Sequence, residues 1–514
     1  MSFVIAYDLG TTGNKATLFS FDGKLIASDF YPYETFYPTS GWVEQDPEQW
    51  WNSVKITTRR LLEKSSVSGG DIKAISFSGQ MMGIVPVDRN GQILRRSIIW
   101  ADQRSVEEAK RLEEELGSKR VYSITGTRVT PTYAGPKIAW VKNNEPEIYK
   151  ETYKFLFAKD YIIFKLTGEI GTDYSDASMS LIFDIKNKEW SDEILQVLDI
   201  DKDKLPKPTS SLEVVGNISP SVAEDIGLSK KTLVIRGAGD GAAATIGAGV
   251  FDTNEAYLYL GTSSWISTCS SEPFFDPKMR TFNFSHPLPD LYCPTGTMQT
   301  GGGSYQWIKD NFYKCEDELS RFLNLDTYAI LDDFLDNTKP TARGLIFLPY
   351  LLGERSPHWN PYAKGAFVGL TMIHKREDML RAVLEGVTFN LKIILEVFEN
   401  EGHFKFEKIR LIGGGANGRN WRQIIADIFN KTVVVPEYPT ESTSIGAAII
   451  SLLGIKAVDI DQAKNLVKDV ITVYPREKYH YEYEKMYDIF LKTYNSLLEI
   501  FNELDGIQKN LINI

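Results

Sequence analysis

The chain has 514 residues, of which 43% are apolar and 24% are charged, and its formal net charge is −11. This length exceeds what one hydrophobic core supports, so it excludes a single small binding module and predicts at least two domains. The composition excludes a collagenous or largely disordered chain, and the net negative charge disfavours sequence-blind binding to nucleic acid or anionic membranes.

The cysteines and the apolar runs indicate the cellular compartment. Cys269, Cys293 and Cys315 lie far apart without C-x-x-C spacing, which argues against a disulfide framework or a zinc site. The first residues lack the basic segment and apolar run of a signal peptide, and no apolar stretch approaches the roughly 20 residues of a membrane span. We therefore expect a soluble, cytoplasmic protein without a membrane or nucleic-acid partner.

The first 60 residues predict a three-strand antiparallel meander followed by a helix. Residues 3–7, 15–21 and 25–33 have strand character, and Asp22-Gly23 forms a hairpin turn between the second and the third. The helix then begins after Asp46, which serves as N-cap to Pro47 at the first helical position. Alternating strands and helices follow.

Small residues near the middle of the chain mark a seam between domains. Residues 232–249 combine an apolar strand, a Gly/Ala cluster around Asp240 and small residues suited to close helix packing. We therefore expect an N-terminal domain over residues 1–247 and a C-terminal domain over residues 248–514. The strand at 256–260 runs into Gly-Thr-Ser, as the first strand runs into Gly-Thr-Thr, so the two halves are expected to share one plan.

The second half is predicted to be rich in helices. Apolar periodicity indicates helices at 377–399, from Asn420, from Thr443 and from Tyr481 onward, and a strand at 409–412.

A Gly-Thr-rich turn follows the first strand. In Asp8-Leu-Gly-Thr-Thr-Gly13, backbone N–H groups and threonine hydroxyls can bind phosphate oxygens, and the Asp8 carboxylate can hold a magnesium ion beside them. The alternative is an ordinary glycine-rich hairpin. The similar turn at Gly261-Thr-Ser-Ser264 favours phosphate binding, because two such turns across a cleft would hold a polyphosphate from both sides.

Asp240 follows a strand and precedes a helix, where a general base can meet a substrate hydroxyl. Aspartate at such a place is more often an N-cap, and the two roles are compatible.

The glycine clusters at 301–303 and 413–418 could let a flat base lie against the backbone, although many such clusters are only turns. Tryptophans are expected in the core or in helix packing rather than as sugar platforms: Trp50, Trp51, Trp100 and Trp140.

Six further motifs follow one another along the chain. They are Trp42 to Trp51, Ser78-Gly-Gln-Met81, Trp100-x-Asp-x-Arg104, Lys159-Asp-Tyr161, Leu348 to Arg355 with Pro357-His358, and the stretch from Gly365 to Gly386. With these motifs the chain resembles the FGGY family of carbohydrate kinases from the first strand to about residue 455, and within that family it is most similar to the xylulokinase subgroup.

The resemblance implies an α/β fold of two actin-like, ribonuclease-H-like domains with a catalytic cleft between them. It implies ATP-dependent phosphorylation of a sugar hydroxyl, with D-xylulose as the first candidate, Asp240 as general base, and Asp8 holding Mg²⁺. The residues that fall at nucleotide- or phosphate-binding positions are Gly10, Thr11, Thr12, Gly13, Lys15, Gly261, Thr262, Gly302, Gln306, Gly414, Asn417 and Gly418. Those on the sugar side are Gln80, Met81, Met82, Asp102, Asp240 and Gly241.

Two sugar-side positions depart from the xylulokinase pattern. Met82 stands where those enzymes usually carry histidine, and Gly241 stands where they carry asparagine. L-xylulose, ribulose, L-fuculose, erythritol and glycerol are therefore alternative substrates. A sugar-independent ATPase of the same fold and a silent sugar sensor are the competing functions, and both monomer and homodimer are open.

Overall fold

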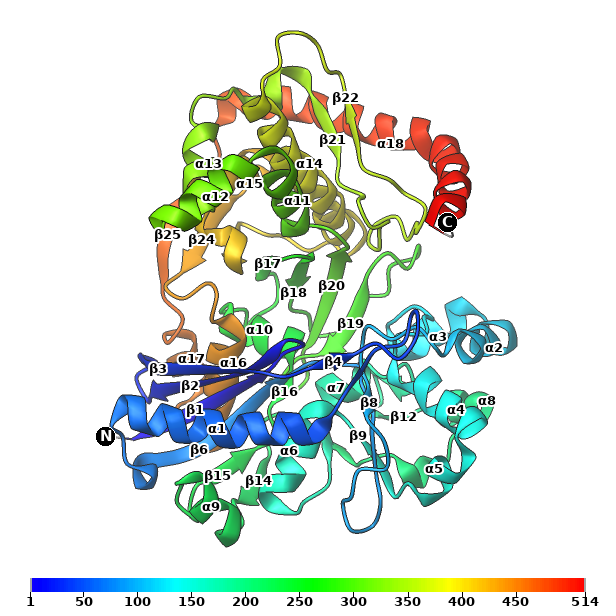
Figure 1. Ribbon diagram of the computed structural model, residues 1–514, viewed down its shortest axis with the longest axis vertical. Helices are drawn as coiled ribbons and strands as arrows, with labels where there is room; N and C mark the ends of the chain where they lie inside the picture. The colour runs from blue at the N-terminus through cyan, green and yellow to red at the C-terminus, as the bar shows by residue number, and fades with distance from the viewer. Residues whose placement is uncertain (1, 513–514) are drawn as a thin grey trace.

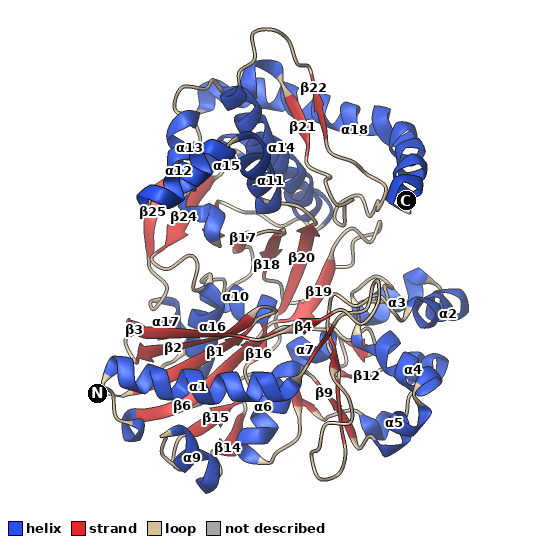
Figure 2. Cartoon of the chain, viewed as in Figure 1, coloured by secondary structure: helices blue, strands red, loops and turns tan. Residues whose placement is uncertain are grey.

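The computed structural model describes residues 2–512 of the chain, with side chains described up to residue 507. Two twisted seven-stranded sheets organise these residues, one built from each half of the sequence (Figure 1). Helices cover the sheets (Figure 2), which makes the fold α/β as expected. No helix within residues 2–512 combines the length and the apolar character that a membrane span requires.

The first sheet begins with the predicted meander. In spatial order its strands are β14 (Val214–Asn217), β15 (Leu233–Ile235), β6 (Ile72–Gly79), β1 (Phe3–Leu9), β2 (Gly13–Ser20) and β3 (Leu25–Pro32), and the short β16 (Ala238–Gly239) also pairs with β6.

Strand β1 is buried on both faces because its alternate side chains enter two different cores. Ile5 and Tyr7 pack in a cluster with residues of α1 (Pro47–Ser65), whereas Val4 and Ala6 pack in a cluster with residues of α16 (Ser442–Gly454). The predicted N-cap of α1 is confirmed, since the Asp46 side chain accepts a hydrogen bond from the backbone N–H of Glu48.

The second sheet repeats the plan of the first. Its strands in spatial order are β19 (Phe282–Ser285), β20 (Tyr292–Met298), β18 (Ser264–Thr268), β17 (Ala256–Leu260), β23 (Lys408–Ile412), β24 (Thr432–Pro436) and β25 (Asp469–Val473). β1 pairs antiparallel with β2 and parallel with β6, and β17 pairs antiparallel with β18 and parallel with β23. The prediction that the two halves share one plan is thereby confirmed.

The remaining elements connect or cover the sheets. The helices of the first half are α2 (Val106–Leu116), α3 (Ser118–Thr125), α4 (Ala134–Asn144), α5 (Pro146–Glu151), α6 (Ala158–Thr167), α7 (Tyr174–Ser178), α8 (Asp192–Leu198), α9 (Pro220–Ile226) and α10 (Asp240–Gly247). Those of the second half are α11 (Gly302–Phe312), α12 (Lys314–Leu323), α13 (Thr327–Leu335), α14 (Arg376–Glu396), α15 (Arg419–Phe429), α17 (Ile460–Lys464) and α18 (Glu477–Ile512). Short strands outside the two sheets are β4 (Thr35–Phe36), β5 (Glu44–Gln45), β7 (Val85–Val87), β8 (Ser97–Ile98), β9 (Lys154–Leu156), β10 (Thr172–Asp173), β11 (Phe183–Asp184), β12 (Glu189–Trp190), β13 (Pro208–Thr209), β21 (Ile346–Leu348) and β22 (Ala366–Val368).

The small residues of the predicted seam bring α10 and α16 into backbone contact. A Cβ added to Gly247 would fall 1.7 Å from the carbonyl oxygen of Ser442, and one added to Gly446 would fall 1.8 Å from that of Ala243. The helices can approach this closely because these positions lack side chains. The domain boundary predicted after residue 247 falls at the end of α10 and stays a prediction; residue 1 and residues 513–514 of the predicted ranges lie outside the described chain.

Candidate active site

Strand pairing in the first sheet brings two carboxylates to the same end. β6 pairs in parallel with β1 on one side and with β16 on the other, which sets Asp8 opposite Ser78 and Gly239 opposite Gly79. Asp240 follows Gly239 as the first residue of α10. The carboxyl ends of these strands therefore carry Asp8 and Asp240 on either side of β6.

Asp8 is anchored by hydroxyl groups from both halves of the chain. Its Oδ1 accepts a hydrogen bond from Ser78 Oγ (3.0 Å), and its Oδ2 accepts one from Thr443 Oγ1 (2.9 Å). Burial raises the pKa of Asp8 above its ordinary value, although both hydroxyls oppose this shift. No cluster of three or more metal-ligating side chains occurs among the described residues. A Mg²⁺ ion here would therefore be coordinated by Asp8 together with phosphate oxygens and waters, which are common ligands of Mg²⁺.

Asp240 is accessible to solvent but closely surrounded by protein. Gly239 is the N-cap of α10, and Asp240 Oδ1 accepts a hydrogen bond from the backbone N–H of Gly241 (2.7 Å). Desolvation raises the pKa of Asp240 to about 7, and the negative charge of Asp8 adds to the shift. A carboxylate with this pKa suits proton abstraction near neutral pH.

The turn between β1 and β2 presents backbone groups and hydroxyls beside Asp8. Thr11 is half-buried and Thr12 is exposed, while Gly10 N–H donates to the Gly13 carbonyl (3.1 Å). Gly13 has a packing role, because a Cβ there would meet the Phe30 ring at 2.4 Å. Lys15 lies opposite Asp8 in the strand register, but its Nζ is bound to Glu441 Oε1 (2.8 Å).

Trp100 corrects the expectation that the four tryptophans belong to the core. Its side chain is 39% exposed, and its indole N–H donates to Thr11 Oγ1 (2.9 Å) at the tip of the phosphate turn. Trp50, Trp51 and Trp140 are buried as expected.

The predicted sugar-side residues follow directly from the end of β6. Gln80 is buried and donates to Gln45 Oε1 (2.8 Å), and Met81 packs against Gly239, where a Cβ would fall 2.4 Å from the methionine Cε. Met82 adopts the left-handed φ of 66°, and its carbonyl accepts a hydrogen bond from Lys137 Nζ (3.1 Å).

Asp102 and Gly241 have packing explanations of their own. Asp102 is fully buried, and its carboxylate oxygens accept from Arg104 Nη2 (2.7 Å) and from the backbone N–H of Val43 (2.5 Å). A Cβ at Gly241 would lie 3.2 Å from Phe284 Cζ on β19, so this aromatic ring would have to shift by a few tenths of an ångström to admit a side chain there. The Asp102 carboxylate is bound by other parts of the protein and is not free.

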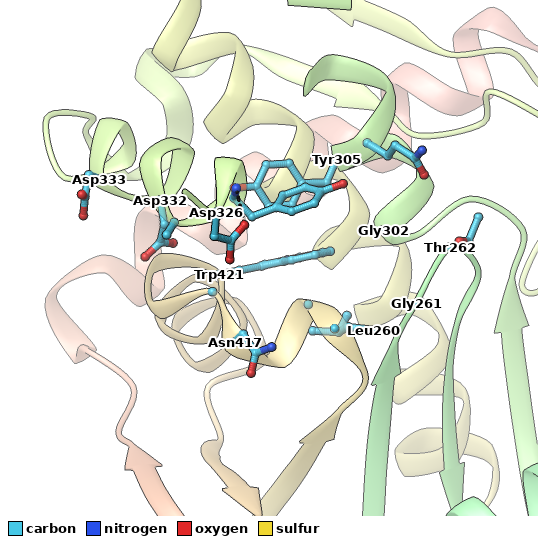
Figure 3. A pocket seen from close by; sticks show the side chains of 16 residues that line it. Leu260, Gly261, Thr262, Gly302, Tyr305, Asp326, Asp332, Asp333, Asn417 and Trp421 are labelled. Atoms are coloured by element: carbon cyan, nitrogen blue, oxygen red, sulfur yellow. Dashed lines mark hydrogen bonds between the residues drawn. The ribbon is translucent and has the colours of Figure 1, made fainter. Parts of the chain in front are cut away.

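A cavity of about 520 Å³ opens in the second half of the chain (Figure 3). It brings together all the nucleotide positions predicted beyond residue 250, namely Gly261, Thr262, Gly302, Gln306, Gly414, Asn417 and Gly418. The first-half positions, Gly10 to Gly13 and Lys15, are not part of its lining.

The cavity has an aromatic wall that sequence reasoning missed. Tyr305 packs edge-on to Trp421, with ring centroids 5.8 Å apart, and to Tyr328, with ring centroids 5.0 Å apart. Figure 3 shows Tyr305 and Trp421 beside the cavity. Tyr305 immediately precedes the predicted Gln306, but at helical spacing an aromatic residue is indistinguishable from ordinary core. Three acidic side chains, Asp326, Asp332 and Asp333, also line the cavity and were not predicted.

Backbone glycines form the floor of the cavity. Gly302 N–H donates to the Gly261 carbonyl (2.7 Å), which locks the two glycine turns together, and a Cβ at Gly302 would fall 2.5 Å from that same oxygen. Beside Gly414, by contrast, the space around an added Cβ is open to 4 Å in the described part of the chain. The cavity therefore has open space beside Gly414 and an aromatic wall at Tyr305 and Trp421.

Tyr259 on β17 links the cavity to the two carboxylates. Burial raises the pKa of Tyr259, and the negative charges of Asp240 and Asp8 raise it further. A Cβ at Gly261 would fall 2.3 Å from Tyr259 Cε1, so the same ring also contacts the turn that lines the cavity.

Comparison with known proteins gives consistent matches over the whole chain. Residues 3–247 match the N-terminal domain of the FGGY family of carbohydrate kinases, and residues 256–454 match its C-terminal domain. The chain is 33% identical over 513 residues to the xylulose kinase of Bacillus subtilis (99% of this chain, 100% of the relative) and 34% identical over 513 residues to the gluconokinase of the same organism (99% of each). Among solved structures, the ligand-bound xylulose kinase from Lactobacillus acidophilus superposes with a TM-score of 0.89 at 28% identity, covering 98% of this chain and 100% of that one.

Proposed function

The chain belongs to the FGGY family of carbohydrate kinases, and on that premise we propose that it transfers the γ-phosphate of ATP to a hydroxyl of D-xylulose. The observation that supports this best is a glycine-floored cavity lined by every nucleotide position predicted beyond residue 250, in a chain whose first sheet carries Asp8 and Asp240 at the same end.

The proposed reaction is a direct transfer of the γ-phosphoryl group from ATP to the sugar hydroxyl. The sugar oxygen attacks the γ-phosphorus, the bond from that phosphorus to the β,γ-bridging oxygen breaks, and Asp240 takes the hydroxyl proton. ADP leaves with the bridging oxygen. Mg²⁺ bound with the phosphates would neutralise charge that develops during transfer, and Asp8 is the carboxylate of this chain that would hold it. Thr11, Thr12 and Thr262 would orient phosphate oxygens from the two turns.

The nucleotide base is proposed to lie in the cavity of the second half. The aromatic wall of Tyr305 and Trp421 supports stacking, and the open space at Gly414 supports a flat group against the backbone. Because the cysteines of the described chain form no disulfide and ATP is a cytoplasmic substrate, we also infer a cytoplasmic location; whether the enzyme is a monomer or a homodimer is left to measurement.

D-gluconate is the second candidate substrate. A curated gluconokinase is as similar to this chain as the xylulose kinases are, and a gluconate kinase structure from Lactobacillus acidophilus superposes with a TM-score of 0.88 at 28% identity. Met82 and Gly241 also depart from the pattern of xylulokinases, which removes two polar side chains from the sugar side. Such losses change discrimination among polyols by about 1–3 kcal/mol each.

The test is ADP release with MgATP against D-xylulose, D-gluconate, L-xylulose, ribulose, L-fuculose, erythritol, glycerol and a no-sugar control. Stimulation by D-xylulose above all others is expected, with transfer confirmed by mass spectrometry of the sugar phosphate. Asp240→Asn should lower kcat by about a hundredfold or more while it still binds ATP, because it removes the general base. Strongest stimulation by D-gluconate would reassign the substrate, and ADP release that no sugar changes would favour the ATPase or the sensor.

A further inference from the structure

A buried serine hydroxyl holds the peptide that precedes Asp240. The backbone N–H of Gly239, the N-cap of α10, donates to Ser175 Oγ (2.9 Å). Ser175 belongs to the short helix α7, and its side chain is 1% exposed. An element distant in the sequence therefore fixes the backbone at the proposed catalytic base.

Ser175 is in turn fixed by a buried ion cluster. Its hydroxyl donates to Asp173 Oδ2, and Asp173 Oδ1 lies 2.8 Å from Lys159 Nζ, which also contacts Asp160 (2.8 Å) and Asp176 (3.0 Å). The lysine and the three carboxylates are fully buried. Although desolvation raises the pKa of Asp173, the Lys159 ammonium and the serine hydroxyls outweigh it and hold this pKa below its ordinary value. Charges paired in such a low-dielectric interior resist displacement, so the cluster is a rigid anchor.

The segment around Asp240 needs such an anchor because of its composition. Gly237, Gly239 and Gly241 surround it, and glycine leaves the backbone more conformational freedom than any other residue. A side chain at Gly239 would have to displace Met81, whose Cε and Sδ would lie 2.4 Å and 2.6 Å from the added Cβ. The hydrogen bond to Ser175 restricts this backbone without adding a side chain at Gly239.

We propose that Ser175 is a positioning residue that, through Gly239, fixes the orientation of the Asp240 carboxylate toward the sugar hydroxyl. The inference rests on the proposed kinase function with Asp240 as general base. Misplacement of a reacting group by about 1 Å can cost on the order of 100-fold in rate, so loss of this contact is expected to affect turnover more than binding.

Ser211 provides the matched control. Its side chain is 2% exposed and its hydroxyl donates to the same Asp173 Oδ2 (2.7 Å), but its side chain has no hydrogen bond to Gly239 within the described chain. Ser211→Ala and Ser175→Ala each remove one buried hydroxyl from Asp173, and only Ser175→Ala also removes the acceptor for Gly239.

The experiment measures kcat, the KM for ATP, ATP affinity by calorimetry and Tm for the wild type and both variants. Ser175→Ala should lower kcat by about 10- to 100-fold with unchanged ATP affinity, whereas Ser211→Ala keeps kcat within about twofold at a similar loss of Tm. Ser175→Thr, which retains the hydroxyl, should recover part of the lost kcat.

Equal kcat values for Ser175→Ala and Ser211→Ala in an active enzyme would overturn the positioning role alone. A wild type that phosphorylates no sugar would overturn the proposed function and this inference with it. If Ser175→Ala does not fold, Ser175→Cys and Ser211→Cys give the same comparison, because a thiol is a weak acceptor of similar size.

Discussion

At the scale of single residues, the chemistry of the site depends on the different surroundings of Asp8 and Asp240. Asp8 accepts hydrogen bonds from two hydroxyls, whereas Asp240 Oδ1 accepts one from the backbone N–H of Gly241 beside it. Both pKa values are raised first by burial, and the charge of Asp8 also acts on Asp240. This difference supports the proposed roles, in which Asp8 holds a cation and Asp240 accepts a proton.

The raised pKa of Asp240 predicts the pH dependence of the reaction. Only the ionised carboxylate can accept the hydroxyl proton, so kcat/KM for the sugar should be lost as pH falls through the folded-state pKa of about 7. Initial rates from about pH 5 to about pH 9 test this; a kcat/KM that does not change across neutral pH would contradict it.

The side chains of the predicted sugar-side residues differ in how far they are free to bind a sugar. Gln80 and Met81, which the family resemblance assigns to the sugar side, follow the end of β6, and Met81 packs against Gly239. Asp102 has the same chemical character as a ligand-binding carboxylate, yet its oxygens are occupied by Arg104 and by the Val43 backbone. Whether a carboxylate is free to bind a ligand depends on its burial and its hydrogen-bond partners, and the residue type reveals neither.

At the scale of elements, helix packing across the seam depends on two glycines. The short distance between α10 and α16 leaves no space for a methyl group at Gly247 or Gly446. α16 also packs against β1 and carries Thr443, whose hydroxyl holds Asp8. Close helix packing and the geometry of the proposed metal ligand are therefore coupled.

Gly446→Ala should destabilise the protein. Its Cβ would fall 1.8 Å from the Ala243 carbonyl oxygen, so the helices must separate, at a cost of about 1–3 kcal/mol or more. Gly506→Ala is the control, because Gly506 lies on α18 with no atom within 4 Å of an added Cβ in the described chain, and alanine is the better helix former by up to about 1 kcal/mol. Denaturant unfolding measures both; an unchanged free energy of unfolding for Gly446→Ala would contradict the contact.

At the scale of the whole molecule, the chain crosses between the two sheets more than once. It leaves the first half after α10 to enter β17, returns after β24 to form α16 and α17 beside the first sheet, and crosses again into β25 (Figure 1). Lys15 on β2 and Glu441 before α16 form an ion pair at one of these crossings. The two halves are therefore connected by several crossings of the chain at one seam.

His286 ties one crossing to the second sheet and predicts a limit to acid stability. Its Nε2–H donates to the Val250 carbonyl (3.1 Å) and its Nδ1 accepts from Leu288 N–H (3.0 Å), so a second ring proton would face a donor. Burial lowers the pKa of His286 from 6.5 to about 4. Between these values the unfolded chain binds more protons than the folded one, so stability falls as pH drops from about 6.5 toward 4.

The measurement is Tm as a function of pH for the wild type and His286→Gln. The variant should lose stability at neutral pH and show a flatter acid limb, because its amide does not titrate in this range. The same slope in both proteins would remove His286 from the explanation.

Local sequence patterns were enough to predict several elements and to indicate the family. The meander of β1 to β3, the Asp46 cap, the glycine turns and the seam around Asp240 follow from alternation, capping chemistry and small-residue clusters. The tertiary structure decided what each polar or aromatic side chain faces. Trp100 at the phosphate turn, the aromatic wall of Tyr305 and Trp421, Thr443 on Asp8 and Ser175 under Gly239 each join residues distant in sequence. Burial, hydrogen-bond partners and pKa are properties of that assembly, so no local pattern could specify them.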